Sequence, residues 1–366
     1  MRRLPTIVMV VFLFLMLMVM PARAEENNEM ELTLEEAIKK ALLHSDSLKI
    51  SELELQKSEE LKDDAAYALA RFSPNWATDY TPGVEPLYVA REQSKMGYEV
   101  ARKKQAAVKD SVILATHKAY YDVLKKEAQV SLATLTVEND ALKLSNARLS
   151  YTNGLISKQA LMGMETQLAV GRAALAAARI ELDKTYKALN LLIGLPENAR
   201  PVLVDKIDFS PFQGDLASQQ TLALDESPNV MSAIENAQLK ERLKGWDENT
   251  SDEDIEIARL QAGMAQDQVK ELVRTLYNSV KTLEENYIPA QNNLRLAEEN
   301  LRVTKIKYEI GMATKSDINE AEKNLADAQQ KLLQLTLDHA YYKLALEKPW
   351  AYNYTGSTGV SSSNTR

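Results

Sequence analysis

Apolar residues recur every seven positions along four long segments of the chain that contain almost no proline. Two neighbouring rows occur between residues 87 and 153: Val123, Val130, Val137, Leu144 and Tyr151, and Leu114, Tyr121, Ala128, Leu135, Leu142 and Leu149. A seven-residue repeat held over five or six heptads is typical of a left-handed coiled coil. Two rows on one helix require two partner helices, so we predict a sheet or ring of helices rather than an isolated pair.

Start and stop signals divide these segments into helices. A capping box at Thr33–Glu36 predicts a short helix to about residue 44, and Ser157 caps the helix that returns after the turn at Gly154. Glycine and proline end the helices. The predicted helices span about 34–44, 48–71, 87–153, 158–193, 216–224, 228–244, 252–310 and 315–347. Pro289 lies inside the seventh of them and predicts a kink there.

The two halves of the chain are an internal duplication. Residues 151–158 (YTNGLISK) match residues 308–315 (YEIGMATK) at an offset of 157, and the apolar register continues beyond them. We therefore predict an all-α fold of duplicated long helical hairpins that form coiled coils. Its parts are a first repeat at 25–194 with its tip at 151–157, an extended linker at 195–215, a second repeat at 216–350 with its tip at 308–314, and a disordered tail at 351–366.

The first 24 residues have the pattern of a secretory signal peptide. Arg2 and Arg3 precede an apolar run from residue 7 to 20, and Ala22-Arg23-Ala24 fits a cleavage site. Removing residues 1–24, which carry three arginines and no acid, changes the net charge from −8 to −11. We expect an exported protein, and its acidic balance argues against a nucleic-acid partner.

The residues offer little for catalysis. The chain has no cysteine and only three histidines, at positions 44, 117 and 339, none of which has a second ligand at metal-binding spacing. No nucleotide-binding, zinc-protease or nucleophile-elbow motif occurs. We expect no enzyme activity, no cofactor and no metal site, and we interpret His339 as a packed residue of a coiled-coil seam.

The two predicted tips share one pattern, in which a glycine is followed by an apolar residue. Gly154-Leu155 and Gly311-Met312 both lie between long helices. One interpretation is a turn with a glycine C-cap and a hydroxyl N-cap. The other is a docking site for another helical hairpin, since a bare apolar residue stands at the end of each protruding hairpin.

Asp317 and Glu320 follow the second tip, three residues apart on one helix face. They act either as cap and first-turn acids of the helix or, in a ring of three copies, as two stacked acidic rings that select cations or hold the mouth shut. The equivalent residues of the first repeat are Ala160 and Gly163, so only the second repeat is acidic here.

On these features the sequence resembles the TolC family of trimeric efflux ducts over nearly all of the mature chain. The resemblance rests on residues 32–42 (LTLEEAIKKAL), on the duplicated Tyr-x-x-Gly tips and on 182–196, where the first half closes. It implies a homotrimer whose twelve hairpin helices form a hollow α-barrel. It also implies partners, namely a membrane-fusion adaptor that docks at Gly154-Leu155 and Gly311-Met312 and an inner-membrane pump. It places Asp317 and Glu320 at the narrow pore entrance.

In one respect we expect a departure from this family, namely the absence of a membrane-spanning β-barrel. Only 15 residues at 72–86 and seven at 245–251 are available at the two insertion points, too few for two spanning strands each. We expect at most peripheral membrane contact. The expected location is the cell envelope or periplasm, the family's being the outer membrane, or the wall space of a cell without an outer membrane.

Two functions of different class follow from the sequence. The first is a passive conduit of a tripartite efflux or type I secretion system, which carries small molecules or proteins across the cell envelope. The alternative is a non-conducting coiled-coil spacer or scaffold of the envelope, which docks an adaptor without forming a pore.

Overall fold

The protein was analysed as a computed structural model, which describes residues 30–72, 82–247 and 250–352. These residues form long helices with only two very short strands, which confirms the predicted all-α fold. The predicted signal peptide and the chain end from residue 353 lie outside the described residues. So do 73–81 and 248–249, which belong to the two short segments considered above.

The first half of the chain forms four helices, whose ends lie close to the predicted ones. They are α2 (Leu34–His44), α3 (Asp46–Phe72), α4 (Glu85–Thr152) and α5 (Lys158–Ile193). The predicted capping box is present, because Thr33 Oγ1 accepts from the N–H of Glu36 while the Glu36 carboxylate accepts from the N–H of Thr33. Ser157 caps α5 by accepting from the N–H of Ala160.

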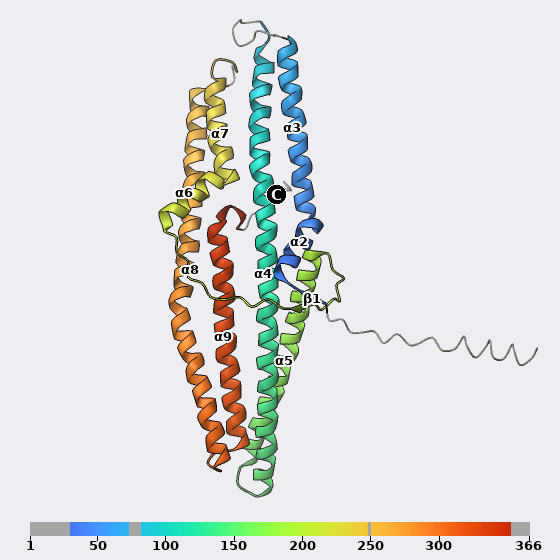
Figure 1. Ribbon diagram of the computed structural model, residues 1–366, viewed down its shortest axis with the longest axis vertical. Helices are drawn as coiled ribbons and strands as arrows, with labels where there is room; N and C mark the ends of the chain where they lie inside the picture. The colour runs from blue at the N-terminus through green and yellow to red at the C-terminus, as the bar shows by residue number, and fades with distance from the viewer. Residues whose placement is uncertain (1–29, 73–81, 248–249, 353–366) are drawn as a thin grey trace, which may run out of the picture.

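The second half repeats this order of helices. It contains α6 (Leu216–Glu226), α7 (Pro228–Leu243), α8 (Asp252–Glu309) and α9 (Lys315–Glu347), followed by a 3-10 turn, η1 (Pro349–Ala351). α8 continues through Pro289 as one helix, whose course bends along its length in Figure 1. The last turn is fixed to the first half, since Lys348 Nζ and Trp350 Nε1 both contact the carboxylate of Asp110, at 2.5 and 2.8 Å.

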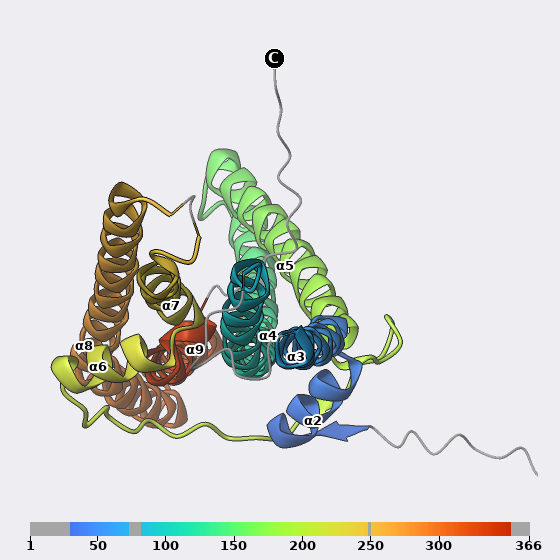
Figure 2. The ribbon, with the colours of Figure 1, turned by 90° about the horizontal axis from the view of Figure 1, so that it is seen from above.

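The molecule has an upper and a lower half, and α4 and α8 run through both (Figure 1). In the lower half, neighbouring helices follow the order α8, α9, α4, α5, and in the upper half the order is α8, α7, α4, α3. Each half is therefore a row of four helices. α8 stands at one edge of both rows, and α3 or α5 stands at the other (Figure 2).

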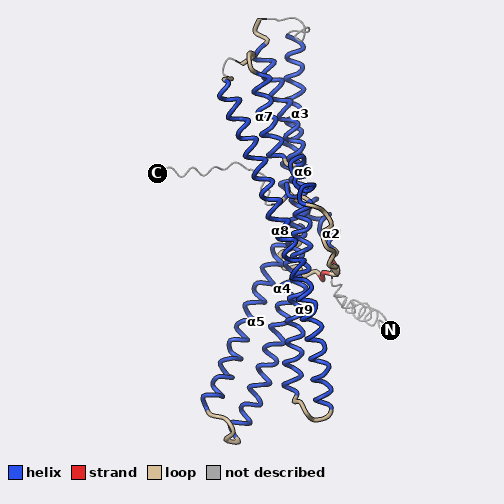
Figure 3. Tube along the Cα trace, turned by 90° about the vertical axis from the view of Figure 1, so that its left-hand side faces the viewer, coloured by secondary structure: helices blue, strands red, loops and turns tan. Residues whose placement is uncertain are grey.

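The predicted heptad rows supply the seams between these helices. Fully or almost fully buried members include Val123, Leu144, Leu168, Leu189, Val273, Val280, Leu301, Ile318 and Leu346. His339 lies in the same row of α9 as Ile318 and Leu346 and is 2% exposed, as its seam position predicts. The heptad residues become more exposed toward the tips, where Leu149, Tyr151 and Tyr308 are exposed. There the two hairpins end in separate turns (Figure 3).

The linker between the repeats crosses one side of the row and is held there by aromatic and polar contacts. Phe209 stacks on Tyr287 of α8, with ring centroids 3.7 Å apart, and lies 4.5 Å from the His339 ring. Glu284 accepts a hydrogen bond of 2.6 Å from the N–H of Phe212. These contacts join the linker to both helices of the second hairpin.

A small sheet that the sequence did not predict anchors the beginning of the linker. β1 (Glu31–Leu32) pairs in parallel with β2 (Val202–Leu203). The hydroxyl of Tyr120 on α4 donates to the carbonyl of Leu32 at 3.0 Å and lies 3.1 Å from Asp205 Oδ2. Segments of two or three residues carry no heptad signal, which is why the helical pattern did not reveal them.

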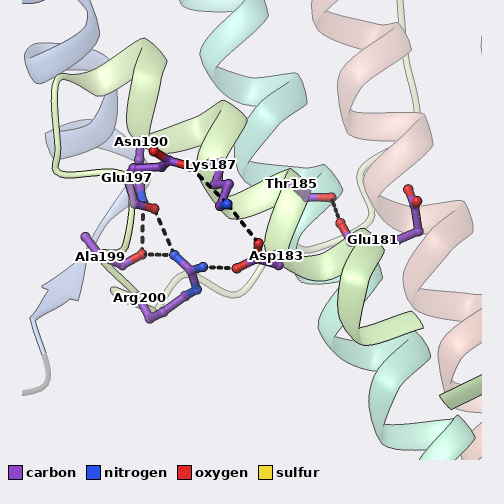
Figure 4. A network of polar contacts seen from close by, with 8 residues as sticks. All are labelled: Glu181, Asp183, Thr185, Lys187, Asn190, Glu197, Ala199 and Arg200. Carbon is purple, nitrogen blue, oxygen red and sulfur yellow. Dashed lines mark hydrogen bonds and ion pairs between the residues drawn. The ribbon is translucent and has the colours of Figure 1, made fainter. Parts of the chain in front are cut away.

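A polar network shapes the loop that leaves α5 (Figure 4). The side-chain amide of Asn190 donates to the carbonyls of Glu197 and Ala199 at 3.2 and 2.9 Å, and Arg200 pairs with Asp183. Gly194 begins this loop with φ +70°, and a Cβ there would lie 2.8 Å from the imidazole of His44 on α2. Both the backbone conformation and the close approach therefore require glycine at this position.

We expect Gly194→Ala to lower the free energy of unfolding by about 1–3 kcal/mol, because the new methyl group meets His44 and the residue stays in the left-handed region. Chemical denaturation followed by circular dichroism measures the change. Gly163→Ala is the matched control, since a Cβ at Gly163 on α5 meets nothing within 4 Å. The control should be neutral or stabilising by up to about 1 kcal/mol. Equal stability of the two variants would contradict the proposed role of the His44 contact.

Candidate functional site

Both hairpin tips have the same backbone structure. Gly154 and Gly311 have φ values of +73° and +76°. The N–H of Leu155 donates to the carbonyl of Ser150 at 2.8 Å, and the N–H of Met312 donates to that of Lys307 at 2.7 Å. The glycine N–H groups donate to carbonyls three residues back, those of Tyr151 and Tyr308. Together these bonds form two Schellman motifs, in which glycine takes the left-handed position.

The apolar residue after each glycine projects into solvent. Leu155 is 75% exposed and Met312 is 74% exposed. A Schellman motif often includes an apolar contact between the residue after the glycine and the last turn of the helix, which buries that residue. Here both side chains are largely exposed, so each hairpin presents one exposed apolar side chain next to its turn.

Asp317 is the N3 acid of a complete capping box at the start of α9, in which Thr314 is the N-cap. Its Oδ2 accepts from the N–H of Thr314 at 2.7 Å and from the Thr314 hydroxyl at 2.8 Å, while the N–H of Asp317 donates to Thr314 Oγ1. These hydrogen bonds, chiefly the one from the backbone N–H of Thr314, lower the pKa of Asp317. Asp317 therefore stays ionised at the helix start and remains exposed.

Glu320 is a link between the two hairpins. Its Oε2 accepts from Lys143 Nζ at 2.6 Å and from Asn139 Nδ2 at 2.7 Å, both on α4 of the first hairpin. The hydrogen bond from Lys143 is the main cause of the lowered pKa of Glu320; burial opposes it, and Asn139 adds to it. The structure thus separates two acids that the sequence treated as a pair. Asp317 bonds within its own helix, and Glu320 bonds across to α4.

Lys143 and Asn139 were not predicted as site residues. At the offset of 157 they correspond to Asn300 and Leu296, so the repeats differ at both positions. A polar residue at 139, among positions that are otherwise mostly apolar on the seam side of α4, was the available signal. Helix spacing alone does not reveal which neighbouring helix such a residue faces.

None of the helices in the described parts of the chain holds an apolar stretch of the length needed to span a bilayer.

Most of the second repeat matches the model of a known protein family. The model of the family described as "Outer membrane efflux protein" matches residues 237–350, which include the end of α7, all of α8 and α9, and the second tip. This part of the chain is therefore similar to the outer membrane efflux proteins. No curated protein is significantly similar to the chain in sequence.

Solved structures of outer membrane proteins share the fold over 87% of this chain. The Campylobacter jejuni CmeC outer membrane channel superposes with a TM-score of 0.62 at 14% identity, over 87% of this chain and 85% of that one. The outer membrane protein VceC from Vibrio cholerae gives a TM-score of 0.62 at 15% identity, over 87% and 95%. The Neisseria gonorrhoeae MtrE outer membrane channel in its open state gives 0.58 at 15% identity, over 87% and 88%. The family match of the second repeat and these structures confirm the resemblance of the sequence to TolC-like outer membrane efflux proteins, and the structures show that their fold is shared.

The ion pair between Lys143 and Glu320 generates a prediction. In a double-mutant cycle of Lys143→Met and Glu320→Gln, we expect a coupling energy of about 0.5 kcal/mol, because both side chains are 39% exposed and water screens the pair. Urea unfolding of the four proteins measures it. The control cycle, Arg148→Met with Glu165→Gln, removes a more exposed pair inside the first hairpin and should give coupling near zero. Equal coupling in both cycles would contradict the role of Glu320 as a link between the hairpins.

Proposed function

We propose that the protein is one subunit of a homotrimeric, TolC-like duct that carries small molecules or proteins passively across the cell envelope. The observation that supports this proposal best is that each four-helix row has uncovered apolar residues at its two edges. A row that ends in uncovered apolar edges needs further helices beside it, and a second copy of the same row supplies them.

The uncovered residues lie on the helices at the edges of the row. Exposed apolar side chains on α5 are Met162, Met164, Val170, Ile180 and Leu191, and those on α8 are Ile257, Leu260, Met264, Ile288, Leu296 and Ile306. On α3 they are Ile50, Leu53, Leu61 and Tyr67. One edge differs from the other, so contact between copies is heterologous and closes into a ring when the rotation between copies fits.

We propose the two tips as the surface that docks a membrane-fusion adaptor. Leu155 and Met312 are the apolar contact residues, and the turns at Gly154 and Gly311 hold them in equivalent positions on the two repeats. Apolar side chains presented by a rigid turn lose little conformational freedom on binding, which favours affinity. The adaptor in turn would join the duct to an inner-membrane pump.

Asp317 and Glu320 are the proposed acidic residues of the pore entrance. In a ring of three copies each position contributes three carboxylates, and such rings favour cations. Asp317 is exposed while it caps α9 through Thr314, and Glu320 is held by Lys143 and Asn139 on α4. Release of Glu320 from Lys143 would add its charge to the entrance when the two hairpins move apart.

The proposed location is the cell envelope, after export under the direction of residues 1–24. The family match and the outer membrane channels that share the fold support an envelope location.

The docking proposal is tested by Leu155→Glu combined with Met312→Glu. We expect at least a tenfold loss of affinity for the purified α-hairpin of a membrane-fusion adaptor from the same cell, because both variants place a charge where apolar contact is needed. Biolayer interferometry measures the affinity, and circular dichroism checks that the helices remain.

The matched control places the same charges at exposed leucines far from the tips and outside the proposed edges of the row, namely Leu43→Glu on α2 with Leu222→Glu on α6. It should keep the affinity of the unmodified protein within twofold. Undiminished binding by the tip variant would show that the tips do not form the docking surface.

A further inference from the structure

A groove of about 630 Å³ runs between α8 and α9, directly above the second tip. Its apolar lining includes four alanines, namely Ala290, Ala297, Ala321 and Ala328. On each helix the two alanines are seven residues apart and therefore share one face of the coiled coil. Small side chains on the facing helices leave the groove between them.

The first hairpin fills the equivalent place. At the offset of 157, Ala297 corresponds to Asp140, which is only 7% exposed, and Ala328 corresponds to Gly171. A Cβ at Gly171 would lie 3.1 Å from Asp140 Oδ2, so the glycine makes room for this carboxylate. The second repeat has small residues at both positions. The groove is thus a feature of one repeat and not a general result of hairpin geometry.

The groove lies on the side of α8 that faces away from the linker. Glu284 binds the linker, and Asn286 lies two residues further, about 200° around the helix. Asn293 and Asn300, which line the groove, continue the row of Asn286 in steps of seven. The linker, α2 and α6 add bulk to one side of the row only (Figure 2), so a closed ring places them outside and the groove inside.

The groove is apolar inside and has hydrogen-bonding groups along both sides. Asn293 and Asn300 lie on the α8 side, and Glu320, Asn324 and Asp327 lie on the α9 side. Glu320 and Asp327 are seven residues apart, a rise of about 10.5 Å along the helix. Carboxylate and amide oxygens accept hydrogen bonds from ammonium groups, and alanine methyl groups suit a chain of methylenes.

A buried amide lies behind Glu320, on the seam between α9 and α4. Asn139 is 1% exposed, and its amide nitrogen donates to Glu320, which lines the groove. The oxygen of the same amide, Oδ1, is buried and has no hydrogen-bond partner in the described chain. This amide is not part of the groove lining; it holds Glu320 in position from the α4 side.

Two lysines, Lys307 and Lys331, line the groove together with three carboxylates, those of Asp317, Glu320 and Asp327, so acids outnumber lysines in the lining. Lys331 pairs with Asp327 at 2.6 Å, four residues apart on α9. Exposed pairs of this spacing contribute about 0.3–0.5 kcal/mol, so a ligand with several ammonium groups can displace the lysine.

We propose that this groove is a cargo-binding site for linear polyamines, whose methylene segments lie on the alanines while their ammonium groups contact the asparagines and carboxylates. The inference rests on the proposed function for the role of cargo, because only a ring places the groove in the bore. Binding itself needs only the hairpin.

The test is titration calorimetry of the mature protein with spermidine at low ionic strength. We expect saturable binding with one site per subunit. Asn293→Leu with Asp327→Asn should weaken it at least tenfold. The matched control is Asn292→Leu with Glu298→Gln, which replaces one asparagine by leucine and one carboxylate by its amide on an exposed part of α8 outside this groove. Its affinity should stay within twofold.

Absence of saturable binding up to millimolar spermidine, or equal loss in both variants, would overturn the proposed site. Light scattering of the same samples separates the two proposals. A trimer that does not bind spermidine contradicts the groove site alone. A monomer that binds spermidine with the expected variant pattern contradicts the ring and supports the site.

Discussion

The arrangement of the helices depends on α4, which has apolar residues to bury on two sides. A helix of 68 residues with two adjacent heptad rows cannot cover both rows with the other arm of its own hairpin. α5 covers one side of its lower part and α3 covers one side of its upper part, while α9 and α7 of the other repeat cover the remaining side. The join between the repeats is therefore a direct consequence of the second row.

Polar contacts fix the register of that join. Lys125 of α4 lies 3.0 Å from Asp338 of α9 near the middle of the molecule, and Lys143 lies 2.6 Å from Glu320 closer to the tips. The linker adds a third connection, since Phe209 and Phe212 pack on α8 and α9 while Asp205 contacts Tyr120 of α4. The apolar seams thus supply most of the stability, and these contacts determine which residues face each other.

The sequence predicted the helices, their caps and both tips because these features depend on residues near one another in the chain. Thr33, Ser157 and Thr314 cap the helices as expected, Gly154 and Gly311 adopt positive φ, and Leu155 and Met312 are exposed. The contact of Glu320 with α4 depends on the packing of helices that are far apart in sequence, which heptads do not specify. The small sheet was too short to leave a periodic signal.

The internal duplication contains information that the helix pattern alone does not. It supports the equivalence of the two tips, and the positions at which the repeats differ mark the features that the structure then explains. Asp140 fills the first hairpin where Ala297 lines the groove of the second. Lys143, which contacts Glu320, corresponds to Asn300 of the second repeat. Differences between repeats are thus a useful guide to sites in duplicated chains of this kind.

The central claim is that the uncovered edges of the row close against other copies of the chain. Sedimentation equilibrium of the mature protein at micromolar concentration, with helix content checked by circular dichroism, tests it most directly. The account predicts a single species of three times the subunit mass. A fully helical protein that sediments as a monomer across this concentration range would contradict it.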